Sequence, residues 1–269
     1  MAKIELRNVM KVFGRNEAAG LALARQGVDK LGILSRTGCS LGLNDVSLDI
    51  PEGEIFVVMG LSGSGKSTLV RHLNRLIDPS AGAIFFAGQD IMKYDAGALR
   101  AFRRRSVSMV FQGFGLLPHR TVLQNVAFGL VTRGEPQSEA YPKAKQWIET
   151  VGLTGYESKY PAELSGGMRQ RVGLARALVA NPDVILMDEA FSALDPLIRW
   201  DMQDLLLELQ RTLKKTIVFI THDLDEAVRL GTSVAMMRDG RVVQVGPPST
   251  ILQQPADDYV ARFVQRRAR

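Results

Sequence analysis

The glycine-rich segment Gly60–Ser67 carries the residue types that bind phosphate, at the spacing that a phosphate-binding loop requires. It reads GLSGSGKS, and it follows the apolar run Ile55–Met59 and precedes a helical pattern. Glycines let backbone N–H groups face a phosphate chain, and the following helix presents its positive end. Lys66 can then reach the β- and γ-phosphates, and the Ser67 hydroxyl can ligate Mg²⁺. The alternative, a plain glycine-rich turn, does not account for this strand, loop and helix context.

Two carboxylates follow a second apolar run, Val184–Met187. An unpaired charge at the end of a buried strand is costly, so Asp188 and Glu189 need a reason to be there. With a phosphate-binding loop in the same chain, Asp188 is placed to hold the Mg²⁺ shell, and Glu189 to orient or deprotonate an attacking water. Apolar strands often end in an acidic turn, so it is the combination with the loop that makes this pattern specific.

A third set of polar residues lies at the ends of other predicted elements. Ser165 precedes Gly166, Gly167 and a helical pattern, so it can cap a helix whose free N–H groups accept an anion. Gln112 and His222 each follow a short apolar strand pattern. An ordinary helix cap is the alternative for Ser165, and a lone Gln, Asp or His is more often structural than functional. Their shared order along the chain favours function.

The second half of the chain alternates helices and strands, which indicates a parallel sheet covered by helices. Ligands of such sheets bind beyond the carboxyl ends of the strands, where the polar residues lie. The predicted elements are a strand Val107–Phe111, a helix Met168–Val179, a strand Asp183–Met187, a helix Leu197–Lys214, a strand Thr216–Ile220, and a hairpin formed by Val234–Met237 and Val242–Val245.

The first half predicts strands at Ile4–Val9 and Leu48–Ile50, interrupted by a helical insertion from Arg15 to Leu43. The helix after the phosphate-binding loop should place Leu69, Val70, Leu73 and Leu76 on one face, and Ala140, Ala144, Trp147, Ile148 and Val151 mark an amphipathic helix within a helical lobe. We hypothesise that the insertion packs beside the phosphate-binding loop and tunes nucleotide access.

The composition is that of a globular protein: 269 residues, 46% hydrophobic and 23% charged. The first residues alternate charged and apolar side chains, and no run approaches the roughly 20 apolar residues that span a bilayer, so a cytosolic protein is expected. A single cysteine, Cys39, fits a reducing compartment. The net charge of +6 is scattered, with clusters at Arg103–Arg105 and Arg266–Arg267. A solvated basic surface is favoured over nucleic-acid binding, and contact with an anionic inner leaflet is a further alternative.

The order of these motifs resembles that of ABC transporter ATPases over nearly the whole chain. Ser165–Gln170, with Leu164, resembles the family's signature motif, Gln112 its glutamine loop, Asp195 its D-loop, and His222 its switch histidine. The resemblance implies an α/β fold: a P-loop NTPase (RecA-like) core with a helical subdomain and an N-terminal antiparallel β region. It also places Phe13 where the family commonly stacks an aromatic ring on adenine, although an ordinary aromatic residue at a strand end is an equal alternative.

For the mechanism, the resemblance implies ATP and Mg²⁺ as cofactors and a head-to-tail homodimer. Each ATP would lie between the phosphate-binding loop of one copy and Ser165–Gly167 of the other. The implied catalytic residues are Lys66, Gln112, Glu189 and His222, and the implied metal ligands are Ser67, Gln112 and Asp188. The implied nucleotide-binding residues are Phe13, Gly60, Ser62, Gly63, Ser64, Gly65, Lys66, Ser67, Thr68, Ser165, Gly166, Gly167 and Asp195.

Three segments resemble the glycine betaine/proline (quaternary amine) uptake group more closely: Thr37–Leu43, Gly60–Arg71 and Asp188–Arg199. This implies an ATP-hydrolysing import subunit for glycine betaine, choline or a proline betaine-like solute. The implied partners are a membrane permease, contacted near Phe114–His119, and an external substrate-binding protein. The protein would be membrane-peripheral, at the cytoplasmic face of the bacterial inner membrane, with no nucleic-acid partner.

The expected organisation is a single ABC ATPase domain over residues 1–269. Within it we expect the insertion at 15–43, the helical subdomain at about 113–163 and a C-terminal strand and helical tail at 240–269. Members of this group often carry a C-terminal pair of CBS modules, which we do not expect here because the sequence stops at Arg269.

Three other functions compete with this interpretation. An importer for another small solute, such as an amino acid or a metal complex, would share the same motifs, but the insertion argues against it. A soluble ABC ATPase of nucleic-acid metabolism would generally carry two cassettes or a long coiled coil, and the sequence shows one set of motifs and no heptad run. A P-loop kinase or GTPase would not need Ser165–Gly167 together with His222.

Overall fold

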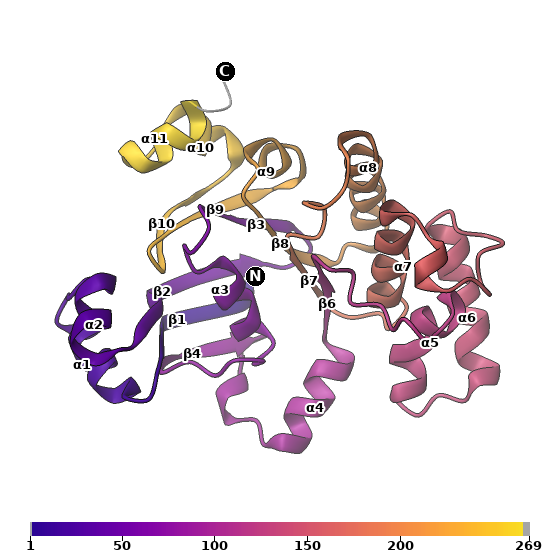
Figure 1. Cartoon of the computed structure of the whole chain (residues 1–269), viewed down its shortest axis with the longest axis horizontal. Coiled ribbons are helices and arrows are strands. Elements are labelled where there is room, and N and C mark those ends of the chain that lie inside the picture. The colour runs from indigo at the N-terminus through magenta and orange to yellow at the C-terminus, as the bar shows by residue number, and fades with distance from the viewer. Residues whose placement is uncertain (1, 266–269) are drawn as a thin grey trace. The chain divides into compact units, whose positions relative to one another are not determined.

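The computed structural model describes residues 2–265, which form two compact units (Figure 1). Unit 1 contains the chain up to Leu99 and again from Ile220 onward, and unit 2 contains Arg100–Phe219. The helix α4 (Ala96–Arg105) and the strand β8 (Thr216–Thr221) both cross from one unit to the other. The predicted basic pair Arg266–Arg267 lies outside the described residues, and the single-domain interpretation stays a prediction.

The N-terminal part of unit 1 is a four-stranded antiparallel sheet in the order β2-β1-β4-β5. Its strands are β1 (Ala2–Phe13), β2 (Ser40–Pro51), β4 (Ala81–Phe86) and β5 (Gln89–Asp90). In β2, buried residues alternate with exposed ones from Val46 to Ile50, as expected of a sheet with one buried face. The predicted antiparallel region is confirmed, and both predicted strands extend further than the sequence pattern indicated.

The insertion between β1 and β2 is helical, as predicted. It forms α1 (Glu17–Arg25) and α2 (Lys30–Thr37), which lie beside each other in Figure 1. Asp29 caps the start of α2, and Gly38, with φ of 69°, ends it in the left-handed conformation. Ile33 and Cys39 are fully buried against β1 and β2. Because Ser40 pairs with Phe13, the last four residues of the predicted insertion belong to β2.

Unit 1 also contains strands of a second sheet. Here β3 (Ile55–Met59) runs parallel to β9 (Ser233–Arg238), and β9 forms the predicted hairpin with β10 (Arg241–Gly246). The helices are α3 (Lys66–Leu73), α9 (Leu224–Leu230), α10 (Pro248–Gln253), α11 (Asp258–Gln265) and the 3-10 turn Ile91–Lys93. The prediction for Leu76 was wrong: α3 ends at Leu73, so Leu76 lies beyond it and is 53% exposed.

Unit 2 contains a parallel strand pair and a helical lobe. The parallel pair β6 (Val107–Phe111) and β7 (Val184–Asp188) confirms the predicted arrangement. The helices are α5 (Val122–Thr132), α6 (Gln137–Thr150), α7 (Gly166–Leu178), α8 (Pro196–Leu213) and the 3-10 turn Pro161–Glu163. Buried side chains of α5, α6 and α7 share one core, which includes Val126, Ile148 and Val172. In residues 2–265, no helix combines the length and apolar character needed to cross a membrane.

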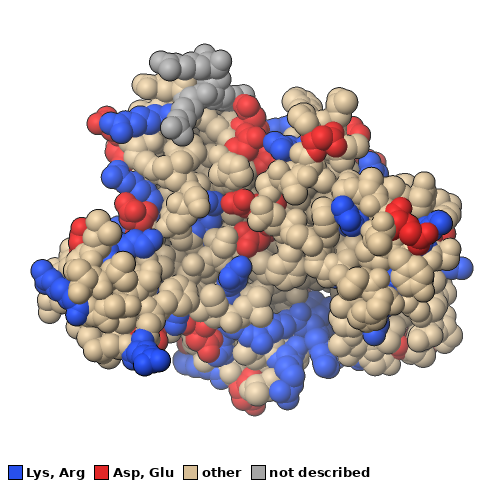
Figure 2. Space-filling view, viewed as in Figure 1, with Lys and Arg blue, Asp and Glu red and all other residues tan. Residues whose placement is uncertain are grey.

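The basic cluster Arg103–Arg105 forms the last turn of α4. Figure 2 shows Lys and Arg side chains gathered over this helix. Cations near a helix C-terminus interact favourably with the helix dipole. Arg104 and Arg105 are exposed, which supports the interpretation of a solvated surface.

The buried imidazole of His72 on α3 predicts a pH-dependent stability. His72 is fully buried, and its Nδ1–H donates to the Thr68 carbonyl at 2.7 Å. Burial lowers the pKa of His72, although the bond to Thr68 opposes this shift. Below the unfolded pKa of about 6.5, the unfolded chain takes up a proton that folded His72 resists. The free energy of unfolding should therefore fall with falling pH, by up to ~1.4 kcal/mol per pH unit, and His72 should add no pH dependence above that value.

Urea unfolding between pH 7.5 and 5.5 checks this expectation. The difference in free energy of unfolding between wild type and His72→Gln should narrow as the pH falls, because the variant has no imidazole to protonate. His119→Gln, at an exposed position, is the control. A difference that stays constant over this range would contradict the prediction.

Candidate nucleotide-binding site

The loop Gly60–Gly65 joins the buried strand β3 to the start of α3 in unit 1. Lys66 is the first residue of α3 and is only 5% exposed. Its ammonium folds back over the loop and donates to the carbonyls of Gly60 at 2.8 Å and Leu61 at 3.1 Å. These bonds hold a positive charge against the loop and compensate the cost of burying it. A phosphate chain that entered the loop would find this cation in place.

Two glycines of the loop cannot be replaced without moving the backbone. A Cβ atom on Gly60 would lie 2.3 Å from the Met237 carbonyl, and one on Gly65 would lie 2.7 Å from the Gly42 carbonyl. Gly65 also has a φ of 105°, which L side chains rarely adopt. The loop is therefore shaped by close backbone contacts on both sides.

Phe13 and Thr68 both lie against Gly42, on β2. A Cβ built on Gly42 would meet the Phe13 ring at 2.6 Å and the Thr68 methyl group at 3.3 Å. Phe13 is 38% exposed, and the Lys11 ammonium lies 5.4 Å from the centre of its ring. The predicted base-stacking residue thus lies near the helix that follows the phosphate-binding loop, with part of its ring open to a ligand.

His222 follows β8 in a loop that its neighbours hold firmly. The Thr221 hydroxyl donates to the buried carboxylate of Glu226 and accepts from the Asp223 N–H at 2.9 Å. Asp223 in turn caps α9 by accepting from the Asp225 N–H at 2.8 Å. His222 itself is exposed. Thr221 and Glu226 thus support the loop that carries His222, and neither was predicted from the sequence. The sequence signal was weak: a threonine at a strand end and a glutamate in the first turn of the next helix.

In unit 2, the carboxyl ends of β6 and β7 bring Gln112 and Glu189 together. Phe111 pairs with Asp188 across the two parallel strands. The Gln112 amide donates to the Ser192 hydroxyl at 3.0 Å, and this hydroxyl donates to the Glu189 carbonyl at 2.9 Å. Glu189 has a φ of 48°, which is uncommon for a residue other than glycine. Ser192 was not among the predicted site residues, although it lies within a segment that carried the resemblance.

The signature segment and Asp195 also meet within unit 2. Ser165 caps α7, with its hydroxyl accepting from the Met168 N–H at 3.3 Å, and Asp195 caps α8 by accepting from the Ile198 N–H at 3.1 Å. A Cβ on Gly167 would lie 2.4 Å from the Ile198 side chain, so only glycine lets the two helix starts approach this closely. Both caps are ordinary structural devices, but both side chains are exposed at adjacent helix N-termini, where an anion is favoured.

The segment after Gln112 is bound to α7 by two arginines. Arg176 donates to the carbonyls of Gly115 at 2.7 Å and Phe114 at 3.1 Å, and burial lowers the pKa of its guanidinium. The Arg169 guanidinium lies 5.0 Å from the centre of the Phe114 ring. Phe114 and Gly115 both have positive φ angles, of 63° and 60°. Two side chains of α7, the helix that begins at the signature segment, therefore hold this unusual backbone conformation in place.

We expect Arg176→Met to release this segment. The loss of two charge-assisted hydrogen bonds should lower the free energy of unfolding by roughly 2 to 4 kcal/mol. Amide hydrogen exchange of Gly113–Gly115 should accelerate, as measured by mass spectrometry. Arg171→Met is the control, because Arg171 lies on the same helix and donates to the Val151 carbonyl instead. Equal exchange at Gly113–Gly115 in the two variants would contradict the prediction.

The insertion touches the phosphate-binding loop through Lys30. The ammonium of this half-buried residue, at the start of α2, lies 3.3 Å from the Gly63 carbonyl. This contact supports the part of our hypothesis that places the insertion beside the loop, and tuning of nucleotide access stays a prediction.

Lys30→Ala should weaken ATP binding two- to threefold, as measured with a fluorescent nucleotide analogue. Arg25→Ala, which removes an exposed cation on α1, is the control. If Lys30→Ala binds the analogue as tightly as this control, the prediction that the insertion tunes nucleotide access is contradicted.

The predicted metal ligands carry donor atoms of the kind that magnesium takes. Magnesium prefers oxygen ligands and usually keeps waters and substrate phosphate oxygens in its shell. The serine hydroxyl, amide and carboxylate of Ser67, Gln112 and Asp188 are donors of this type. No cluster of three or more His, Cys, Asp or Glu side chains suited to a metal occurs within residues 2–265. The chemistry of each donor is compatible with Mg²⁺, and their assembly around one ion stays a prediction.

A buried strand, a glycine-rich loop closed by a lysine, and a second strand ending in two carboxylates define a P-loop nucleotide-binding protein of the α/β class. The family model described as ABC transporter matches residues 43–192, which include the loop, the signature segment and both carboxylates. The chain belongs to the ABC transporter family.

Curated relatives resemble the chain over almost its whole length. It is 54% identical over 98% of its length to the glycine betaine/carnitine transport ATP-binding protein GbuA of Listeria monocytogenes. It is 56% identical over 97% of its length to the glycine betaine/proline betaine transport system ATP-binding protein ProV of Escherichia coli. The trimethylamine N-oxide transport system ATP-binding protein TmoW of Ruegeria pomeroyi is 50% identical. The chain spans 67%, 65% and 77% of these three proteins, respectively.

Solved structures confirm the P-loop NTPase fold of ABC ATPases. A dimeric post-hydrolysis structure of the ATP-binding cassette MJ0796, bound to ADP and Pi, is 30% identical with a TM-score of 0.77, covering 91% of this chain and 98% of that one. The cbiO1 protein of Clostridium perfringens, part of an ABC transporter complex, is 27% identical with the same TM-score, covering 99% of this chain and 95% of the other.

Proposed function

We propose that this protein is the ATP-hydrolysing subunit of an importer for a small quaternary or otherwise methylated amine such as glycine betaine, choline or a proline betaine-like solute. The observation that carries the proposal is the pair of clusters already described: Lys66 folded over the glycine loop, and Glu189 joined through Ser192 to Gln112. The names of the relatives GbuA, ProV and TmoW support the solute class. The ATPase does not touch the solute, so this class is inferred by association.

In the proposed mechanism, each residue has a physical role. The loop N–H groups and Lys66 bind the β- and γ-phosphates, Phe13 contacts the base, and Ser67, Gln112 and Asp188 would hold Mg²⁺, which supplies charge neutralisation at the phosphates. Glu189 orients and deprotonates the attacking water. His222 contacts the γ-phosphate, and its position is fixed by the bonds of Thr221 and Asp223 on either side.

Two copies complete each site. Ser165–Gly167, at the start of α7, would cover the phosphates bound by the other copy, and Asp195 would line the same interface. The exposed helix starts of α7 and α8 support this arrangement. The dimeric structures of the MJ0796 cassette are a precedent for such a pair. The permease would dock near Phe114–His119, with an external binding protein delivering the solute, and the ATPase would lie at the cytoplasmic face of the bacterial inner membrane.

A transport assay tests the proposal. The protein is captured from detergent-solubilised native membranes with its permease and reconstituted in liposomes that contain ATP and Mg²⁺. Uptake of labelled glycine betaine, choline and proline betaine is measured with the binding protein outside. We expect uptake of at least one solute, and none with Glu189→Gln. A complex that hydrolyses ATP but transports none of the three solutes would overturn the proposed solute class. A purified protein without ATPase activity would overturn the proposed ATP-hydrolysing function.

A further inference from the structure

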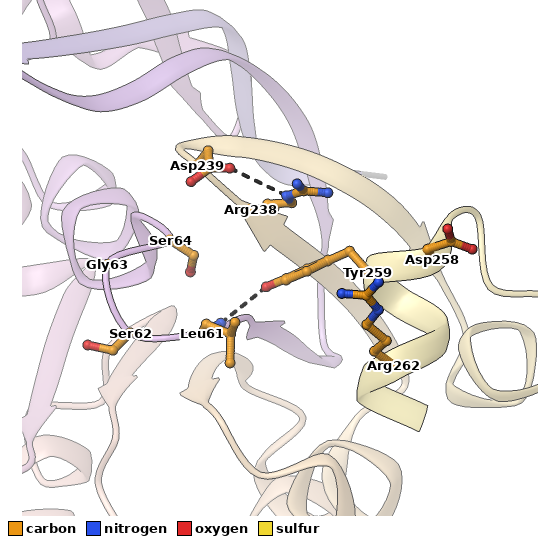
Figure 3. Close-up of a pocket in the computed structure, with 9 residues that line it drawn as sticks. All are labelled: Leu61, Ser62, Gly63, Ser64, Arg238, Asp239, Asp258, Tyr259 and Arg262. Atoms are coloured by element: carbon orange, nitrogen blue, oxygen red, sulfur yellow. Dashed lines mark hydrogen bonds and ion pairs between the residues drawn. The ribbon is translucent and has the colours of Figure 1, made fainter. Parts of the chain in front are cut away.

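The outer side of the phosphate-binding loop is attached to a helix at the end of the described chain. Tyr259, on α11, points its hydroxyl between the loop and β9 (Figure 3). The Leu61 N–H donates to this hydroxyl at 3.2 Å, and the hydroxyl donates to the Met237 carbonyl at 2.9 Å. One phenol oxygen thus joins the second residue of the loop to the end of the neighbouring strand.

The phenol ring is held in place from two sides. The Arg238 guanidinium lies 5.2 Å from the ring centre, and the Phe263 ring packs edge-on with the two centres 5.4 Å apart. Val260, the next residue, is fully buried and anchors α11. Burial raises the pKa of Tyr259, so the hydroxyl keeps the proton that it donates to Met237.

The loop is also linked directly to the β9–β10 hairpin, because the Gly240 N–H donates to the Ser64 carbonyl at 2.9 Å. Leu61 is 48% exposed, and its side chain borders a cavity of about 500 Å³ between the loop, the hairpin turn and α11 (Figure 3). Water in this cavity could replace the hydroxyl as a hydrogen-bonding partner, but it could not fix the distance between Leu61 and Met237.

We propose that Tyr259 is a positioning residue for the phosphate-binding loop, and that α11 thereby sets the affinity of the loop for the nucleotide. The inference rests on the proposed ATP-binding function. A loop whose N–H groups are already directed at the phosphates loses less conformational entropy on binding than a loop that must be ordered first. Loss of the bridge should therefore weaken nucleotide binding more than it slows the chemical step.

Tyr259→Phe tests the proposal because it removes the hydroxyl and keeps the ring. The matched control is Tyr94→Phe, which removes a hydroxyl that donates to Gln89 at 2.8 Å elsewhere in unit 1. For Tyr259→Phe we expect a three- to tenfold increase in the Kd for a fluorescent ATP analogue and in the KM for ATP, with kcat within twofold of wild type. In the nucleotide-free protein, amide exchange at Leu61 should also accelerate. Tyr94→Phe should change none of these.

Three outcomes would overturn the inference in different ways. If Tyr259→Phe binds the analogue as tightly as wild type and Leu61 exchanges at the wild-type rate, Tyr259 is not a positioning residue. A purely structural effect would lower Tm without separating KM from kcat, and this result would also overturn it. If wild type itself fails to bind the analogue, the proposed function falls, and this inference falls with it.

Discussion

Glu189→Gln should reduce ATP turnover at least about 100-fold while leaving ATP binding intact. Glutamine has the size of glutamate but cannot accept a proton from water, so the variant loses the base and keeps the fold. The substitution leaves the backbone contacts of Glu189 in place, because its carbonyl accepts from both the N–H and the hydroxyl of Ser192. Glutamine can keep this backbone, including its φ of 48°.

The same variant should accumulate as an ATP-bound dimer. If hydrolysis opens the pair, a pair that cannot hydrolyse stays closed. Phosphate release measures turnover, and sedimentation with ATP and with ADP measures association. Glu135→Gln, which removes a half-buried carboxylate paired with Lys143 at 2.7 Å, is the control and should behave as wild type. Turnover at the normal rate in Glu189→Gln would rule out Glu189 as the base.

The sequence pattern predicted the strands and helices that carry the site residues. It also located these residues, because they follow directly where a strand ends or precede a helix start. An all-buried strand such as Ile55–Met59 forms a continuous apolar run, and the glycine spacing that follows it is typical of phosphate-binding loops and of little else. The hairpin at Asp239 and the helical insertion were equally visible. Leu76 shows the limit of this reasoning: its spacing fits the helical face, but Asn74 ends α3 first.

The supporting residues could not be predicted because their partners are distant in sequence or have no distinctive pattern. Tyr259 contacts Leu61 across 198 positions, and Gln112 reaches Ser192 across 80. Glu226 is only five positions from Thr221, but a glutamate in a first helical turn normally faces solvent. Such residues become recognisable only when burial and distance are known.

Lys66→Ala should have the second large effect, a loss of ATP affinity of about 100-fold, or roughly 2.7 kcal/mol. Lys66 is only 5% exposed, and in the nucleotide-free loop its ammonium donates to the carbonyls of Gly60 and Leu61. Phosphate oxygens carry more negative charge than carbonyl oxygens. The hydrogen bonds of the ammonium therefore become stronger when it leaves the carbonyls and binds phosphate. Alanine removes this gain.

Stability should respond to Lys66→Ala far less than affinity does. The variant leaves two carbonyls without the ammonium, but it also removes the cost of burying a charge, and these two effects oppose each other. We expect the free energy of unfolding, measured without nucleotide, to change by less than about 1 kcal/mol. The control is Lys93→Ala, at an exposed position. If Lys66→Ala unfolded the protein while the remaining folded fraction bound ATP normally, Lys66 would be a structural residue of the loop and not its phosphate ligand.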